Sequence, residues 1–152
     1  MTSTSPKHAA GRRSLTRRSR RAGLTFETGI LEHLVDREPE NLDYLAALGE
    51  AYTRLRRYRQ GLAVDRRLVE RAPEEPIHRY NLACSQVLTG DLDGACASLI
   101  KAFDLGYRDF DHLARDPDLR KLRDDDRFAL VREHFERHHD GELEADDGGA
   151  GA

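Results

Sequence analysis

The stretch Leu42–Glu75, LDYLAALGEAYTRLRRYRQGLAVDRRLVERAPEE, decides the fold. Its closing Pro73 lies 34 residues after Pro39, and each proline follows a helix-forming run that ends in an apolar pair. A further shift of 34 residues aligns Leu48-Gly49 with Leu82-Ala83. The pattern therefore predicts an all-α chain in which one helical hairpin recurs about two and a half times. Hairpins of this size bury their apolar faces mainly on their neighbours, so we expect a short α-hairpin solenoid.

The spacing also matches a known repeat signature, which runs from an apolar residue through Leu-Gly, a Tyr and a small residue to a closing Pro. It is carried by Leu45, Leu48, Gly49, Tyr52, Leu55, Tyr58, Gly61, Leu68 and Pro73. In these positions the chain resembles the tetratricopeptide repeat family. The resemblance implies a partial repeat over residues 24–41, a repeat over 42–75 and a looser repeat over 76–109, in which Tyr107 stands in place of the proline.

Local signals place the helices and turns inside these repeats. Leu45, Leu48, Tyr52 and Leu55 recur at intervals of three and four, which predicts one apolar helical stripe. A turn is expected at Arg56-Arg57. Another is expected at Gly90-Asp91, where the glycine can adopt a left-handed conformation and the aspartate can cap the next helix.

The residues after the second repeat predict a capping segment of two short helices over 110–139. Asp116 before Pro117 is a strong helix start, and the acidic run Asp124–Asp126 precedes the apolar residues that begin with Phe128. This ending is similar to the terminal segment of many bacterial tetratricopeptide proteins. The resemblance implies that it finishes the array and presents a polar outer face.

The two ends of the chain carry opposite charge. Residues 1–23 hold seven bases and no acid, a net charge of +7, whereas residues 140–152 hold five acids and no base. Both segments are poor in apolar side chains, so we expect a disordered basic arm over 1–23 and a disordered acidic tail over 140–152. The arm either captures a polyanion such as nucleic acid or only solubilises the chain, since it has no aromatic residue for stacking on bases. The candidate polyanion-binding residues are Arg12, Arg13, Arg17, Arg18, Arg20 and Arg21.

A partner surface follows from the resemblance, because the first helix of each hairpin lines the concave face in the family. The matching positions are Glu50, Arg54, Ile77, Tyr80, Asn81, Cys84, Val87 and Leu88. Family members that clamp a carboxylate use Lys and Asn, but only Asn81 matches here, so we expect an extended partner segment with apolar anchors. The alternative is that Tyr80, Val87 and Leu88 pack under the terminal helices and leave no open groove.

Two charged residues occupy positions where the repeat pattern has apolar ones. Asp65 aligns with Leu31 and Leu99, and Arg79 aligns with Leu45. Both lie on faces that meet between hairpins, and an isolated buried carboxylate would cost several kcal/mol. We therefore expect an ion pair between Asp65 and Arg79, the alternative being that each side chain reaches solvent separately.

Other classes of site are weakly indicated. His134 and His138 have the i, i+4 spacing of metal ligands but no third ligand nearby, so we expect no metal, and Cys84 and Cys96 are interpreted as small core residues. No cofactor motif or catalytic constellation is recognisable, no run approaches the roughly 20 apolar residues of a membrane span, and a cytoplasmic location is the default. The sequence favours a non-enzymatic protein-interaction module or adaptor, with polyanion or nucleic-acid binding through the basic arm as the alternative.

Overall fold

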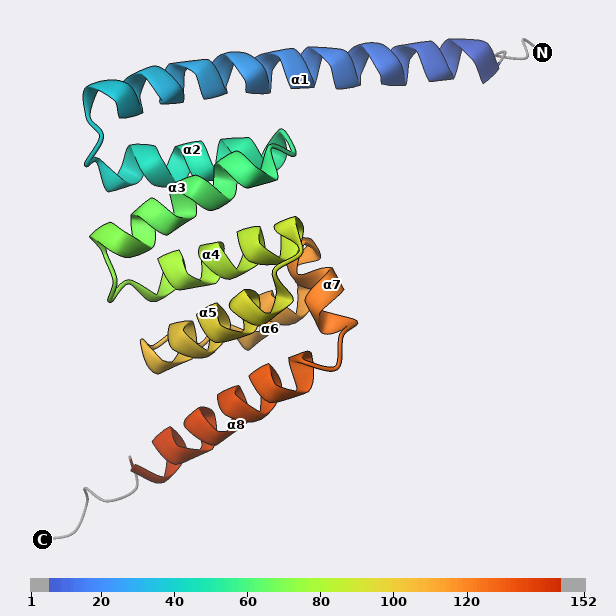
Figure 1. The fold of residues 1–152 in the computed structure, drawn as a ribbon. Coiled ribbons are helices and arrows are strands. Elements are labelled where there is room, and N and C mark those ends of the chain that lie inside the picture. The colour runs from blue at the N-terminus through green and yellow to red at the C-terminus, as the bar shows by residue number, and fades with distance from the viewer. Residues whose placement is uncertain (1–5, 146–152) are drawn as a thin grey trace, which may run out of the picture.

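The structure, a computed structural model, describes residues 6–145, and every regular element in that range is a helix. Successive helices pack against one another in a single stack, with α1 at one end and α8 at the other (Figure 1). This arrangement confirms the predicted all-α hairpin solenoid with a terminal helical cap. The elements are α1 (Pro6–Arg37), α2 (Leu42–Arg54), α3 (Tyr58–Arg71), α4 (Pro76–Thr89), α5 (Leu92–Asp104), α6 (Phe110–Arg115), the 3₁₀ helix η1 (Pro117–Leu119), α7 (Arg120–Arg123) and α8 (Phe128–Ala145).

Capping residues set the helix boundaries. The Asn41 side chain accepts hydrogen bonds from the first turn of α2, and Asp91 does the same for Gly94 in α5. Gly90 has a φ of 92°, the left-handed conformation predicted for the end of α4. The turn after α2 also falls where it was predicted, but there Arg56 takes a φ of 60°, which is uncommon for a residue with a Cβ.

The ends of the chain differ from the predicted disordered tails. Helix α1 is continuous from Pro6, so the expectation of disorder is wrong for residues 6–23, and helix α8 continues through residues 140–145. The physical reason in α1 is propagation, because adding residues to a helix that is already nucleated costs little. Val35 anchors α1 against α2, and the preceding residues extend that helix. Residues 1–5 and 146–152 lie outside the described range.

Two apolar clusters hold the stack together. The smaller cluster joins α1, α2 and α3 through Val35, Leu45, Leu48, Tyr52, Val64 and Leu68. The larger cluster joins α4 and α5 to the terminal helices, where α8 packs on α5 and η1 packs on α4. At its centre, the Phe103 ring lies 5.0 Å from the Phe135 ring and the Tyr80 ring stacks 4.6 Å from the Tyr107 ring, measured between centroids.

Small residues lie where helices approach one another closely. Ala83, Ala95 and Ala102 are fully buried between α4, α5 and the cap. A Cβ on Gly49 would lie 3.0 Å from Oδ1 of Asp65, so this glycine leaves room for a carboxylate between α2 and α3. Within residues 6–145, none of the helices combines the length and apolarity needed to cross a membrane.

Candidate functional site

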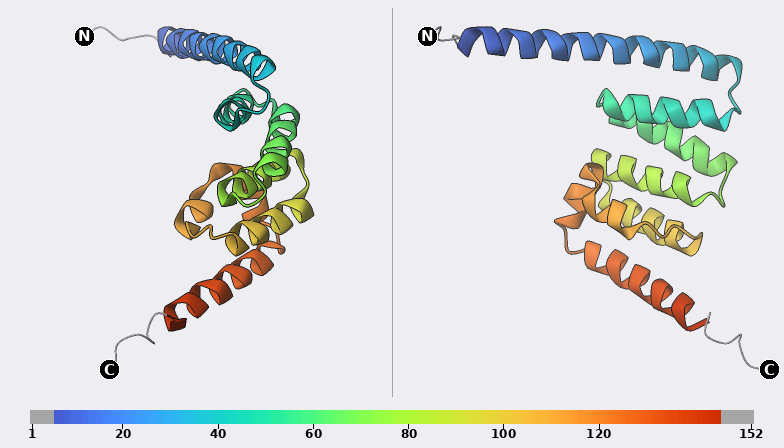
Figure 2. Two further views of the ribbon diagram at one scale, coloured as in Figure 1. Left: turned by 90° about the vertical axis from the view of Figure 1, so that its left-hand side faces the viewer. Right: turned by 180° about the vertical axis from the view of Figure 1, so that it is seen from behind.

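A hollow of about 560 Å³ lies between α2, α4 and the segment that contains α6 and η1. In the left view of Figure 2, α2 and the orange α6–α7 segment lie on the same side of the stack. Most residues that line the hollow belong to α2 and α4, the first helices of the two hairpins, so it lies on the face that the resemblance assigned to a partner. Its lining residues are Ala46, Gly49, Glu50, Thr53, Asp65, Tyr80, Asn81, Cys84, Ser85, His112, Asp116 and Asp118.

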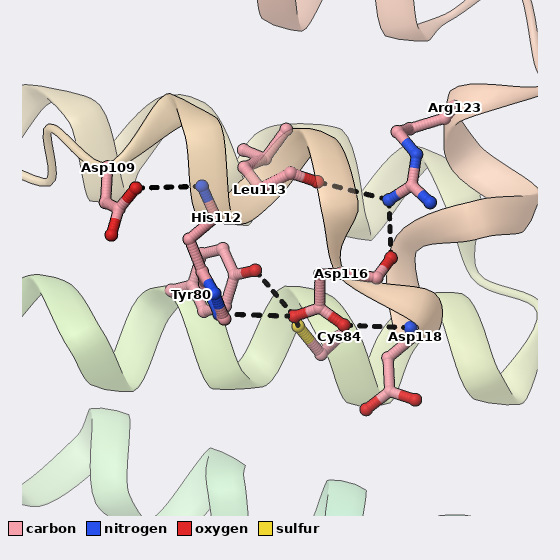
Figure 3. Close-up of polar contacts among 8 residues, drawn as sticks. All are labelled: Tyr80, Cys84, Asp109, His112, Leu113, Asp116, Asp118 and Arg123. Atoms are coloured by element: carbon pink, nitrogen blue, oxygen red, sulfur yellow. Dashed lines mark hydrogen bonds and ion pairs between the residues drawn. The ribbon is translucent and has the colours of Figure 1, made fainter.

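Asp116 forms one wall of this hollow and ties the terminal segment to α4. One carboxylate oxygen accepts a hydrogen bond of 2.6 Å from the Tyr80 hydroxyl and a weaker one of 3.7 Å from the Cys84 thiol (Figure 3). The other oxygen caps η1 by accepting from the backbone N–H of Asp118 at 2.9 Å. The ring of His112, one turn earlier, lies 3.6 Å from the same carboxylate. Asp116 is thus both the predicted helix start and a fixed part of the wall.

The backbone around Asp116 is held in place by Arg123 from α7. Its guanidinium donates to the carbonyl oxygen of Asp116 at 2.5 Å and to that of Leu113 at 3.1 Å (Figure 3). Burial raises the pKa of the Tyr80 hydroxyl and of the Cys84 thiol, and the Asp116 charge raises both further. Both groups therefore remain protonated at neutral pH, so Cys84 is not a reactive thiolate.

Asp65 forms the floor of the hollow. Only 6% of the residue is exposed, and its carboxylate accepts a short hydrogen bond of 2.5 Å from the Ser85 hydroxyl. Burial raises the pKa of Asp65 to about 6, and the Ser85 hydrogen bond partly offsets that rise. The carboxylate is therefore mostly ionised at pH 7, although its environment disfavours the charge.

The expected ion pair between Asp65 and Arg79 is wrong. Among residues 6–145, Asp65 makes its side-chain contact with Ser85, and Nε of Arg79 is buried without a hydrogen-bond partner. Ser85 is on the same helix as Arg79 but six residues later, about 120° further around the helix, and it is the α4 residue whose side chain meets Asp65. The carboxylate has a neutral partner in place of the predicted cation.

The charge of the hollow is strongly negative. Glu50, Asp65, Asp116 and Asp118 line it, and His112 is the one basic side chain among its lining residues. Burial raises the pKa of Asp118, and the neighbouring Asp116 charge raises it further. These four carboxylates and the imidazole form a concave acidic surface that can receive a cationic group, and we call it the acidic pocket.

Four of the eight predicted partner-binding residues, Glu50, Tyr80, Asn81 and Cys84, line the acidic pocket. Ile77 is 44% exposed, and it and Leu88 are not among the lining residues. The sequence placed Val87 on the partner surface, but it is fully buried in the larger cluster because the terminal helices cover that side of α4. Arg54 follows the lining residue Thr53 at the end of α2, but it does not line the pocket and forms an ion pair of 3.7 Å with Glu27.

The sequence did not single out Ser85 or the pocket roles of Asp65, His112, Asp116 and Asp118. Asp116 and Asp118 were recognised only as helix-capping residues, and that role gave no indication that the cap folds back onto α4. A usable signal existed at Asp65, because a charged residue at an apolar repeat position indicates a polar interior, but the expected partner was the wrong one.

The arginines of α1 divide between two faces. Arg17, Arg20 and Arg21 face the turn between α2 and α3, where they line a groove of about 320 Å³ together with Leu24, Arg54, Leu55 and Arg56. Arg18 lies on the side of α1 that carries Phe26, and Arg21 borders this side as well as the groove. The backbone of Arg12 and Arg13 is helical, but their side chains are outside the described part of the structure. We call the first of these surfaces the arginine groove.

The residues considered as metal ligands or a disulfide have other surroundings. His134 lies 2.8 Å from the Asp104 carboxylate, and the side chain of His138 is outside the described residues. No group of three ligating side chains suited to a metal occurs in the part of the chain that the structure describes. Cys96 is buried and Cys84 lines the acidic pocket, and both thiols are free.

Comparisons with known proteins bear on the fold. No family model matches the chain, and no curated protein matches it. Among solved structures, the chain is similar to one titled "MamA RS-1 ArsTM double mutant", with a TM-score of 0.61 and 19% sequence identity over 85% of this chain and 70% of that chain. MamA is a tetratricopeptide-like protein, so this similarity supports a tetratricopeptide-like fold for the stack.

Proposed function

We propose that this chain is a protein-interaction module that binds a segment of another protein in the acidic pocket, with an arginine or lysine of that segment as the anchor. The tetratricopeptide-like fold supports a protein-binding role in general terms. The observation that carries the finer proposal is Asp65, a carboxylate that is only 6% exposed and meets a neutral hydroxyl instead of a cation.

The cost of keeping the buried Asp65 carboxylate ionised favours a cationic ligand. A raised carboxylate pKa means that ionisation at neutral pH is disfavoured by the pocket, and an incoming cation would remove that cost. Asp116 and Asp118, which also line the pocket, attract a cation as well. An arginine would also find several carboxylate oxygens for its planar array of donors.

The pocket's lining argues against the apolar anchors expected from the sequence. Val87, one of the apolar residues assigned to the groove, is buried in the core, and Leu88 does not line the pocket. The exposed side chains that remain around the opening, such as Glu50 and His112, are polar. An adaptor role in the cytoplasm is part of this proposal.

The test is an NMR titration of the full chain with the peptide acetyl-Gly-Ser-Arg-Ser-Gly-amide, and with its citrulline analogue as an uncharged control of nearly the same shape. We expect the arginine peptide to shift the backbone amides of Gly49, Cys84 and Ser85 saturably, with the millimolar affinity typical of a single anchor, which is about −4 kcal/mol. The citrulline peptide should leave these amides unshifted.

Matched variants make this test specific. Asp65→Asn removes the buried charge but keeps the shape of the side chain, and it should weaken binding of the arginine peptide about tenfold. Glu70→Gln removes an exposed charge from the same helix and should leave binding unchanged. Equal shifts with both peptides, or shifts outside the pocket, would show that the pocket does not select a cation.

Polyanion binding is the second candidate, and the arginine groove is the observation that favours it. Three arginines of α1 and two from the end of α2 and the turn after it line one groove, so the basic charge comes from two regions of the fold. Anisotropy of a labelled single-stranded oligonucleotide measures this activity, and its affinity should fall steeply with salt. Exchanging Arg54 and Arg56 for Gln should reduce that salt slope, by about 0.7 for each phosphate that is no longer neutralised.

A further inference from the structure

Helix α1 is packed on one side only. Thr28 and Val35 are buried on the side that meets α2, and α1 lies at the end of the stack with no further helix beyond it in residues 6–145 (Figures 1 and 2). On the opposite side, Phe26 is 73% exposed and Ile30 is 47% exposed. These two side chains, one turn apart, leave an apolar patch open to solvent.

The patch belongs to a longer stripe along the helix. Ser19, Ala22, Phe26, Ile30 and His33 follow one another at intervals of three or four residues, which places them on one face. Intervals of this kind form the contact line of paired helices. Nothing lies within 4 Å of a Cβ built on either Gly23 or Gly29 beside Phe26, so a large side chain from a partner has space there.

We propose that this stripe is a homodimer interface on which α1 of a second copy packs in the antiparallel direction. A two-fold axis between Phe26 and Ile30 would place Phe26 of each copy against Ile30 of the other. The same register would place Ala22 against His33 and Ser19 against Arg37. All three pairings follow from one register, because the residue numbers in each pair add up to 55 or 56.

The distribution of charge along α1 favours the antiparallel direction for a second copy. The described half before Phe26 carries arginines and no acid, whereas Glu27, Glu32 and Asp36 follow it. Arg18 and Asp36 are 18 residues apart, which is five helical turns, so both lie on the same edge of the stripe. In the antiparallel register, Arg18 of one copy meets Asp36 of the other on that edge, whereas a parallel pair would align arginine with arginine.

The proposal is independent of the acidic pocket and of the arginine groove. The pocket lies between α2, α4 and η1, and Arg17, Arg20 and Arg21 of the groove face the turn after α2. The stripe lies on the face of α1 opposite the buried Thr28 and Val35, whereas the groove lies between α1 and the turn after α2, so a dimer leaves both surfaces open. Arg21 borders both the groove and the stripe. Failure of the peptide-binding proposal would therefore not affect this one.

Sedimentation equilibrium of the full chain from low to high micromolar concentration tests the dimer. We expect the mean mass to rise from that of one copy toward that of two. The double variant Phe26→Glu with Ile30→Glu should remain monomeric over the same range. Leu130→Glu, at an apolar residue of α8 that is 60% exposed, is the matched control and should associate like the natural chain. Circular dichroism verifies that each variant stays helical.

A charge exchange tests the register. Arg18→Asp alone and Asp36→Arg alone should each reduce the dimer fraction, because each places like charges opposite one another, and the two changes combined should restore it. A natural chain that stays monomeric, or a Phe26 and Ile30 variant that still associates, overturns the interface. A combined variant that is no better than the single ones overturns the antiparallel register.

Discussion

The two ends of the stack are finished in different ways. At the carboxyl end, α6 to α8 cover α4 and α5, and the apolar side chains Leu113, Leu119, Leu122 and Val131 are fully buried there. At the amino end, α1 covers α2 with one face and leaves Phe26 and Ile30 in solvent. A solenoid must shield its last apolar face. Only the carboxyl end of this one does so within the described chain.

The polar contacts at the two ends differ in the same sense. The cap is joined to α4 by a partly buried hydrogen bond from Tyr80 to Asp116, and Arg123 holds the cap together internally by donating to the backbone carbonyls of Leu113 and Asp116. Helix α1 is joined to the stack by exposed ion pairs, such as Glu27 with Arg54 and Glu32 with Arg57. Exposed pairs of this kind contribute little to stability. The cap is therefore expected to be the more stable end.

The largest effect on stability is expected from Phe103→Ala, which removes a side chain at the centre of the larger cluster. Phe103 is fully buried and contacts the rings of Tyr107 and Phe135, so its removal leaves a cavity. The free energy of unfolding should fall by about 3–5 kcal/mol. Phe26→Ala is the matched control, and in dilute, monomeric protein it should change the free energy by less than about 0.5 kcal/mol. Urea unfolding measures both, and equal losses would contradict the contrast between the two ends.

An intermediate effect is expected from Asp65→Asn, at the junction between the two halves. The folded state raises the pKa of Asp65 to about 6, above the ordinary value of 3.8, so ionisation destabilises the fold at neutral pH. The variant should be more stable than the natural chain by about 1–3 kcal/mol at pH 7.5.

The size of this effect depends on pH. Stability of the natural chain should fall as pH rises from about 4 to beyond 6, because the folded state holds the Asp65 proton more tightly than the unfolded state does. Below pH 4 the carboxyl is protonated in both states, and the gain from Asn should vanish. Thermal unfolding across this range measures it, and a constant gain would contradict a charge origin.

The smallest effect is expected from Glu32→Ala at the amino end. The Glu32 carboxylate accepts a hydrogen bond of 2.8 Å from the Tyr52 hydroxyl and lies 3.7 Å from the Arg57 guanidinium. The Glu32 and Arg57 side chains are 42% and 41% exposed, so water can reach the place of the carboxylate. The free energy of unfolding should fall by about 0.5–1 kcal/mol. Proteolysis of α1 should increase more than that of α8, and a loss of stability as large as that of Phe103→Ala would contradict the weak attachment of this end.

Much of the fold was accessible from the sequence, because its signals are local. Gly90 and Asp91 end and start helices as predicted, and Asp116 with Pro117 starts the cap. The wrong predictions concern residues whose state depends on distant partners. Arg79 was expected to pair with Asp65, and residues 6–23 were expected to be disordered, but the surroundings of a side chain and the extension of a helix depend on how neighbouring helices dock.

The sequence by itself determined the helices, the turns between them and the 34-residue period, since each depends on spacing, caps and apolar stripes within a few turns of chain. Only the tertiary structure decided the candidate site. The acidic pocket exists because the cap folds back and places Asp116 and Asp118 opposite Glu50 and Asp65, across 51 to 68 residues of chain. A repeat pattern does not predict a contact between residues so far apart in the chain, because such a contact results from the angle at which packed helices meet.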